Sequence, residues 1–142
     1  MGRILTQRDG PMEISVRLTS HPLESWELSF PLDGSSGVVL VFYGVVRREE
    51  QNHWIEALHY EAYETMAKEE LFRICQELGK RYPCQRVEVV HRVGKVPVGE
   101  ASLGIRVFAR HRSEALGLLT ELVDRLKERV PIWKAPCTIN NS

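Results

Sequence analysis

Residues 38–46 (VVLVFYGVV) form an almost continuously apolar run, and this run most constrains how the chain folds. Its β-branched and aromatic side chains favour extended backbone and pack well on a pleated surface. We therefore interpret it as a central strand of a sheet. Gly44 interrupts the run, which predicts a β-bulge or a close backbone approach at that point.

Periodic patterns in the remaining sequence predict the other elements. Apolar alternation or enrichment predicts strands over residues 12–18, 54–63, 87–93 and 101–109. A helical period predicts long helices over 65–80 and 113–129. Pro22 near a possible first turn predicts a short helix over 23–28. Ser113 is the expected N-cap of the last helix, and Pro131 ends it. Segments 47–52 and 94–100 have the composition of connections.

The order of these elements favours one fold class. Short turns between consecutive strands imply antiparallel pairing. We expect an α+β fold with a mostly antiparallel sheet and packed helices, rather than a doubly wound sheet. The chain has 142 residues, of which 43% are hydrophobic, so we expect a single domain over residues 1–142 with a core of its own.

The charge balance narrows the class of ligand. Lys and Arg number 19, Asp and Glu number 19, and the formal net charge is zero. General nucleic-acid-binding proteins usually carry an excess of basic residues, so the zero net charge argues against this class. Any site for an anion must therefore be local.

Cysteine and histidine spacing argues against disulfides and metals. The chain has three cysteines, an odd number, and no C-x-x-C pair. A reducing, cytoplasmic setting fits this usage best. We expect no metal site, because His21, His53 and His59 lack ligand spacing, and no cofactor, because glycine-rich phosphate loops are absent. No apolar run has the length of a membrane span, and residues 1–10 lack the apolar stretch of a signal peptide.

Cations bracket the last predicted helix. His111 and Arg112 precede its start, Lys127 lies near its end, and Lys134 follows the break at Pro131. Backbone N–H groups and the helix dipole favour anions at a helix start, and Arg adds a planar fork suited to phosphate. This pattern predicts a site for an anionic substrate. The alternative is a surface pair of cations without a ligand.

The other cations also have ordinary alternatives. Lys127 near a helix C-terminus is commonly a solvated partner of the dipole. Lys134 beside Trp133 is either a snorkelling surface residue or a cation held against a ring in a pocket. Arg47 leaves the end of the most apolar strand, where loops often carry function, but it also fits a plain turn charge.

The pair His91-Arg92 repeats the His-Arg combination inside a predicted strand. We interpret it as structural, with the imidazole satisfied in the sheet and Arg92 on the exposed face. Cys75 falls on the apolar stripe of its helix and is interpreted as a core residue. No Ser-His-Asp or Cys-His arrangement indicates nucleophilic catalysis.

Four short motifs occur in order between residues 38 and 134. They read FYGVVR (42–47), HRVG-x4-GE (91–100), HRS (111–113) and LK-x6-K (126–134). Each motif alone is weak, but the four in this order and spacing resemble the large subunit of molybdopterin synthase, the MoaE family. The similarity covers most of the chain.

The resemblance implies a specific reaction, fold and assembly. The fold would be an α/β hammerhead-like arrangement. A small ubiquitin-like subunit would carry sulfur as a thiocarboxylate on a C-terminal Gly-Gly tail. Two sulfurs would pass to cyclic pyranopterin monophosphate, giving the dithiolene of molybdopterin. The large subunits would form a homodimer within a cytoplasmic heterotetramer.

The family's site residues match five positions of this chain. Arg47, His111, Arg112, Lys127 and Lys134 are the substrate-binding residues that the resemblance implies. Our hypothesis is that the first three hold phosphate. Lys127 and Lys134 are the expected catalytic residues: Lys127 would stabilise developing charge or transfer a proton, if burial among cations lowers its pKa. Lys134 would neutralise the thiocarboxylate or an acyl intermediate.

Helix geometry predicts that the pocket is composite. Arg112 and Lys127 are 15 positions apart, which is about 22 Å along a continuous helix. One small pterin phosphate cannot easily contact both within one chain. We therefore expect Lys127, Lys134 and Arg47 to come from one protomer, and His111 and Arg112 from its twofold mate.

The chain departs from the family pattern at three places. The family usually has a basic residue where Val45 stands and a basic-acidic pair at Ala135-Pro136, and this chain ends at Ser142 without the longer tail. These departures predict a less closed pocket or an altered tail. Two alternatives stay open: a non-catalytic paralogue that binds a ubiquitin-like sulfur carrier, and a small-molecule sensor.

Overall fold

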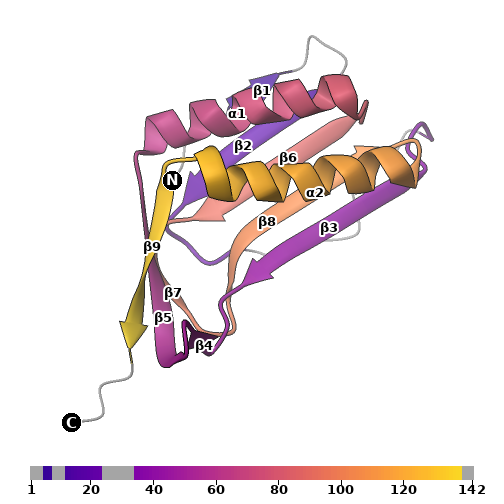
Figure 1. The fold of residues 1–142 in the computed structure, drawn as a ribbon. Helices are drawn as coiled ribbons and strands as arrows, with labels where there is room; N and C mark the ends of the chain where they lie inside the picture. Colours follow the sequence, from indigo (N-terminus) through magenta and orange to yellow (C-terminus); the bar gives the residue numbers. More distant parts are fainter. Residues whose placement is uncertain (1–4, 8–11, 24–33, 139–142) are drawn as a thin grey trace.

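A five-stranded sheet forms the larger layer of the molecule (Figure 1). The computed structural model describes residues 5–7, 12–23 and 34–138. The strand order is β1-β2-β6-β8-β3, and all neighbours are antiparallel except β2 and β6, which are parallel. The strands are β1 (Leu5–Gln7), β2 (Glu13–Thr19), β3 (Val38–Val45), β6 (Arg86–Arg92) and β8 (Ala101–Ala109). The predicted short helix over 23–28 lies, apart from Leu23, outside the described residues.

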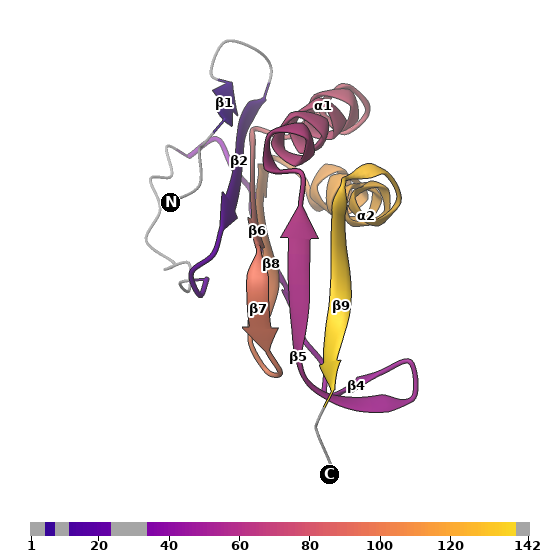
Figure 2. The same ribbon diagram turned by 90° about the vertical axis from the view of Figure 1, so that its left-hand side faces the viewer.

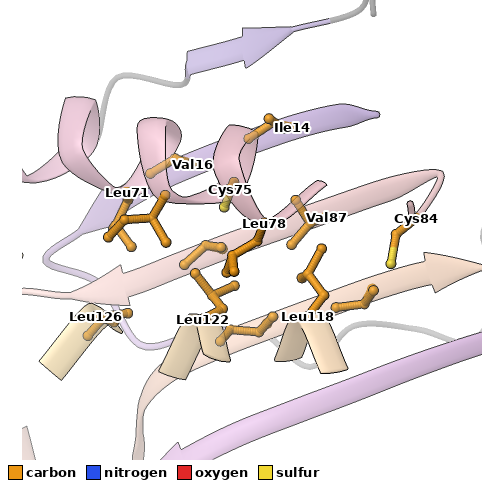
Figure 3. Packing of buried hydrophobic residues seen from close by; sticks show 14 of the residues in the cluster. Ile14, Val16, Leu71, Cys75, Leu78, Cys84, Val87, Leu118, Leu122 and Leu126 are labelled. Carbon is orange, nitrogen blue, oxygen red and sulfur yellow. The ribbon is translucent and has the colours of Figure 1, made fainter. Parts of the chain in front are cut away.

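Two helices cover one face of this sheet (Figure 2). They are α1 (Glu64–Arg81) and α2 (Arg112–Arg129), which agree with the predicted helices to within one residue. Leu71 and Leu78 of α1 and Leu118 and Leu122 of α2 are fully buried between the helices and the sheet (Figure 3). Burial of such a side chain stabilises the fold by about 1.5–3 kcal/mol. The burial of these leucine side chains therefore holds both helices against the sheet.

The start of α2 differs from the prediction. The N-cap is His111, whose backbone is extended, and the helix begins at Arg112. Ser113 is thus the second helical residue, so its prediction as the N-cap was wrong. The helix is otherwise continuous to Arg129, and within the described chain no helix is both long and apolar enough to cross a membrane.

A smaller sheet extends beyond one end of the larger one (Figure 1). Its central strand β5 (His53–Ala62) pairs antiparallel with each of the other three, which are β4 (Glu49–Glu50), β7 (Gly94–Pro97) and β9 (Ile132–Thr138). The segments of β4 and β7 were predicted as connections, and β9 was not predicted. Gln51 and Asn52 have positive φ, as a tight two-residue hairpin turn between β4 and β5 requires.

Strand β3 lies at the edge of the larger sheet, so its prediction as a central strand was wrong. Among the described strands it pairs with β8 alone. Phe42 packs against the core, whereas Val41, Tyr43 and Val45 are 42%, 37% and 51% exposed. The register shifts between Gly44 and Val45, which confirms the predicted bulge. Within the described part of the chain, the outward-facing side chains of the apolar run are therefore partly exposed.

The expected α+β class with a mostly antiparallel sheet is confirmed. Among the described strands, the one parallel pair, β2 with β6, joins strands that are far apart in the sequence. Short turns predict only the pairing of strands that follow each other in the sequence, so they could not predict this pair.

Candidate functional site

A cavity of about 450 Å³ lies where the end of α2 meets the two sheets. Its wall combines the ends of β3, β6 and β8 with residues of β5 and β9. Strand β9 begins directly after α2 and runs along β5, which brings the end of the helix to the junction of the sheets (Figure 1). Apolar residues such as Phe42, Leu103 and Trp133 supply much of the lining.

Two of the predicted cations line this cavity together. Lys127 stands on the last turn of α2, and Lys134 stands on β9 opposite Tyr60 of β5. The Nζ of Lys134 lies 3.1 Å from a carboxylate oxygen of Glu50, so β4 holds this lysine in place. Lys127 is exposed in the single chain, so the burial on which its expected proton transfer depended is absent there.

Three polar side chains and one backbone carbonyl complete the wall of the cavity. The sequence did not predict that these groups lie together. The hydroxyl of Tyr60 donates to Oγ of Ser102 at 3.2 Å, and Ser102 donates to the Gly44 carbonyl at 3.4 Å. The imidazole of His91 meets the Tyr60 ring edge-on, with 5.1 Å between ring centroids. All four residues line the cavity.

The structure corrects the interpretation of Arg92 in the His91-Arg92 pair. His91 is buried with its imidazole hydrogen bonded in the sheet, as predicted, and it also lines the cavity. Arg92 was predicted on the exposed face, yet it is 6% exposed and pairs with Glu100 at 2.6 Å. Glu100, whose side chain is 44% exposed, neutralises the buried guanidinium next to His91.

His91 is held as a neutral base. Its Nδ1 lies 2.8 Å from the Arg92 carbonyl oxygen, which can only accept, so Nδ1 carries the hydrogen. Burial lowers the pKa of His91 below its ordinary value, and the hydrogen bond to Arg92 opposes that shift. The neutral ring therefore keeps an unprotonated Nε2 as its remaining polar atom.

The other three predicted site residues do not line this cavity. Within the described chain, Arg47, His111 and Arg112 are exposed and are not among the residues that line it. His111 borders a second cavity of about 330 Å³ at the opposite end of α2. The intervening 15 residues of helix correspond to about 22 Å. Among described residues, the five predicted side chains thus do not converge in one chain.

Two of the three cysteines are buried in the core. Cys75 and Cys84 are buried, as predicted for Cys75, and burial raises the pKa of each thiol to about 12. Both are therefore protonated at neutral pH and are poor nucleophiles.

Comparison with known proteins decides the family. A family model described as MoaE protein matches residues 18–129. The chain belongs to the MoaE family. The bovine molybdopterin synthase catalytic subunit is 37% identical over 120 residues, covering 84% of this chain and 64% of that protein. The relative of the same name from Drosophila persimilis is 39% identical, and this chain spans 34% of its length.

Solved structures of MoaE-family proteins share the fold. The crystal structure of molybdopterin synthase from Staphylococcus aureus matches with a TM-score of 0.79 at 30% identity, covering 87% of this chain and 91% of that chain. A complex of subunits 1 and 2 of the molybdopterin-converting factor from Helicobacter pylori matches with a TM-score of 0.60 at 24% identity, covering 75% and 74%. The second likeness concerns the fold alone.

Proposed function

We propose that this MoaE-family chain is the catalytic subunit of a molybdopterin synthase, a sulfurtransferase of molybdenum cofactor biosynthesis. It would transfer sulfur from the thiocarboxylate of a small ubiquitin-like subunit to cyclic pyranopterin monophosphate, forming the dithiolene. The observation that carries the proposal is the presence of Lys127 and Lys134 on the wall of one cavity at the end of α2.

The cavity suits an extended tail that ends in an anion. A Gly-Gly tail has no side chains, so its backbone fits a cleft between apolar walls such as Leu103 and Trp133. The thiocarboxylate at its end is negative and would be attracted by the two lysines. Lys134 already pairs with Glu50 at 3.1 Å, so the incoming sulfur would compete with that carboxylate.

The lysines would act mainly through charge. In sulfur transfer, negative charge develops near the acyl carbon and the sulfur, and a preorganised cation stabilises it. Lys127 is the proposed residue at the reacting centre, and Lys134 would neutralise the thiocarboxylate or an acyl intermediate. Arg47, His111 and Arg112 would hold the substrate phosphate, for which Arg offers a two-pronged contact.

A twofold homodimer within a heterotetramer would complete the site. His111 and Arg112 lie about 22 Å from Lys127 along α2, too far for one small substrate. Among the described residues, the exposed apolar side chains of Val41 and Val45 on the edge strand support a partner on β3, and Val45 also lines the cavity. A mate docked near this edge would bring its own His111 and Arg112 to the cavity. The three cysteines are free, which supports a reducing, cytoplasmic setting.

One observation favours a second candidate, a non-catalytic paralogue that binds the sulfur carrier. Val45 lines the cavity at a position where the family usually has a basic residue. The cavity thus has one cation fewer to hold an anionic substrate. This paralogue would bind the tail and give no product.

A reconstitution experiment distinguishes the two candidates. Purified chain, thiocarboxylated small subunit and cyclic pyranopterin monophosphate are mixed, and dithiolene is measured. We expect product from the unaltered chain and a loss of at least about 100-fold in Lys127→Ala, since removal of one preorganised charge-stabilising group costs 10²–10³ in rate. Tail binding without product indicates the paralogue.

Lys80→Ala is the matched control. Lys80 lies in the last turn of α1 as Lys127 lies in the last turn of α2, and it is exposed. Its loss should leave turnover unchanged. Near-normal turnover in Lys127→Ala, with the dimer intact, contradicts the role assigned to Lys127.

A further inference from the structure

His91 is a buried titratable group for which the proposed function has no use. Among the described residues that line the cavity, it is the one ionisable side chain that is buried, at 4% exposure. Tyr60 is partly buried, and Lys127 and Lys134 are exposed. A buried imidazole on the wall of a cavity that Lys127 and Lys134 also line is a candidate for a functional role.

The surrounding structure fixes the orientation of the ring. Residue 91 lies inside the sheet, where it pairs with Leu18 of β2 on one side and Leu103 of β8 on the other. The hydrogen bond from Nδ1 to the Arg92 carbonyl and the edge-on contact with Tyr60 fix the ring. The next residue, Arg92, is anchored to Glu100. Nε2 is therefore a prepositioned acceptor rather than part of a mobile side chain.

Burial keeps His91 neutral, and the groups that share the cavity with it offer no competing base. Tyr60 of β5, Ser102 of β8, Lys127 of α2 and Lys134 of β9 share the cavity with it, whereas the lining residues of β3 are apolar or glycine. Among the described lining residues there is no carboxylate. Because burial lowers its pKa, the ring is neutral and has a lone pair to offer. A lysine ammonium has no acceptor atom and cannot serve in its place.

The chemistry of a thiocarboxylate donor requires such an acceptor. Once the donor sulfur is bonded to a substrate carbon, it still carries the acyl group, so tail and substrate are joined by a thioester. Releasing the sulfur to the substrate requires water to cleave the bond between acyl carbon and sulfur. The attacking water must give up a proton, and a positioned base accelerates this step by about 10²–10⁴.

We propose that His91 is a catalytic residue of this cavity, whose Nε2 accepts the proton of the water molecule that hydrolyses the tail–substrate thioester. The inference rests on the proposed sulfur transfer. The water oxygen bonds to the acyl carbon, and the carbon–sulfur bond breaks with its electron pair leaving on sulfur as a thiolate. One water proton goes to Nε2. The new carboxylic acid releases the other to solvent, and the imidazolium then returns its proton to solvent.

The test is His91→Asn in the reconstituted complex under single-turnover conditions. The Asn amide nitrogen can replace Nδ1 in the hydrogen bond to Arg92, but the side chain has nothing at the place of Nε2. We expect the covalent conjugate of small subunit and substrate to form and persist, as followed by mass spectrometry. Its hydrolysis should slow by about 100-fold or more. His59→Asn, an exposed histidine on β5, is the control and should hydrolyse the conjugate normally.

Two further readouts separate a base from a structural residue. Conjugate hydrolysis by the unaltered chain should slow as the pH falls through the lowered pKa of His91, and this dependence should be absent in His91→Asn. Added imidazole should restore hydrolysis in His91→Ala, since the cavity has room for a small base. His91→Gln serves as the second variant if His91→Asn unfolds.

The outcomes distinguish this role from the proposed function. Conjugate that accumulates in His91→Asn and disappears on adding imidazole to His91→Ala supports it. Normal hydrolysis in folded His91→Asn overturns the role of His91 and leaves the sulfur transfer intact. Equal loss of conjugate formation and hydrolysis, with no effect of imidazole, also overturns it. If the unaltered chain forms neither conjugate nor product, the proposed function itself is wrong.

Discussion

His91 links the chemistry of the cavity to the stability of the fold. Its folded-state pKa is lowered by burial, so between that value and its ordinary pKa the unfolded chain binds a proton that the folded chain does not. Stability from this residue is therefore present above the ordinary pKa of 6.5 and is lost as the pH falls below it. The loss is at most about 1.4 kcal/mol per pH unit.

The prediction is tested by urea unfolding of the unaltered chain and His91→Asn at pH 7.5 and 5.5. The free energy of unfolding should fall further in the unaltered chain than in the variant, which has no group to protonate at this position. Comparing the two chains removes the contribution of other titrating groups. Identical losses in both proteins would mean that the imidazole accepts its proton without cost.

At the level of elements, replacing glycine by alanine should have opposite effects on stability at two helical positions, Gly117 and Gly79. A Cβ added at Gly117 of α2 would lie 2.6 Å from Cδ1 of the Tyr82 ring, which hydrogen bonds to Glu121 and packs against the core. A Cβ at Gly79 of α1 would lie 2.8 Å from the terminal methyl of Met12, a flexible group. Alanine favours a helix by about 1 kcal/mol over glycine at either site.

We therefore expect Gly117→Ala to lower the free energy of unfolding by about 1–3 kcal/mol, because a rigid ring must move. Gly79→Ala should be neutral or stabilising by up to about 1 kcal/mol, since Met12 can change rotamer. Urea titration of both variants provides the measurement. A more stable Gly117→Ala protein would show that Tyr82 is not fixed between the helices.

The helices and strands also show how much of the fold can be predicted from the sequence. Strand β8 and both helices were predicted almost to the residue because their apolar periods are strong and one face of each is buried. Strands β7 and β9 were not predicted from the sequence. They contain Pro97 and Pro136, which lack an N–H and therefore argue against a strand. A strand at the edge of a sheet nevertheless tolerates proline. Lys127 and Lys134 were predicted from charge, whereas Tyr60, His91 and Ser102 meet only through long-range pairing.

At the level of the whole molecule, the length of α2 separates the two halves of the predicted site. Lys127 and Lys134 line the cavity at one end, and His111 and Arg112 lie about 22 Å away at the other. The exposed apolar side chain of Val45 on β3 also lines the cavity. If two chains meet there, each cavity draws its lysines from one chain and its His111-Arg112 pair from the other.

Mixing two inactive variants tests this composite arrangement. In a dimer of Lys127→Ala with Arg112→Ala, one cavity loses both groups and the other keeps both. Random exchange at equal concentration makes half of the dimers mixed, so about a quarter of the original sites are restored in a twofold assembly. We expect dithiolene formation to recover to that fraction, whereas each variant alone stays inactive.

A second mixture is the matched control for the first. Lys127→Ala mixed with Lys134→Ala should give no recovery, because both lysines line the same cavity and every site in the mixed dimer lacks one of them. Recovery in both mixtures would point to free exchange of substrate between damaged sites rather than to shared ones. Recovery in neither, with mixed dimers present by mass spectrometry, would mean that each chain builds its site alone and that α2 is not a spacer between two cavities.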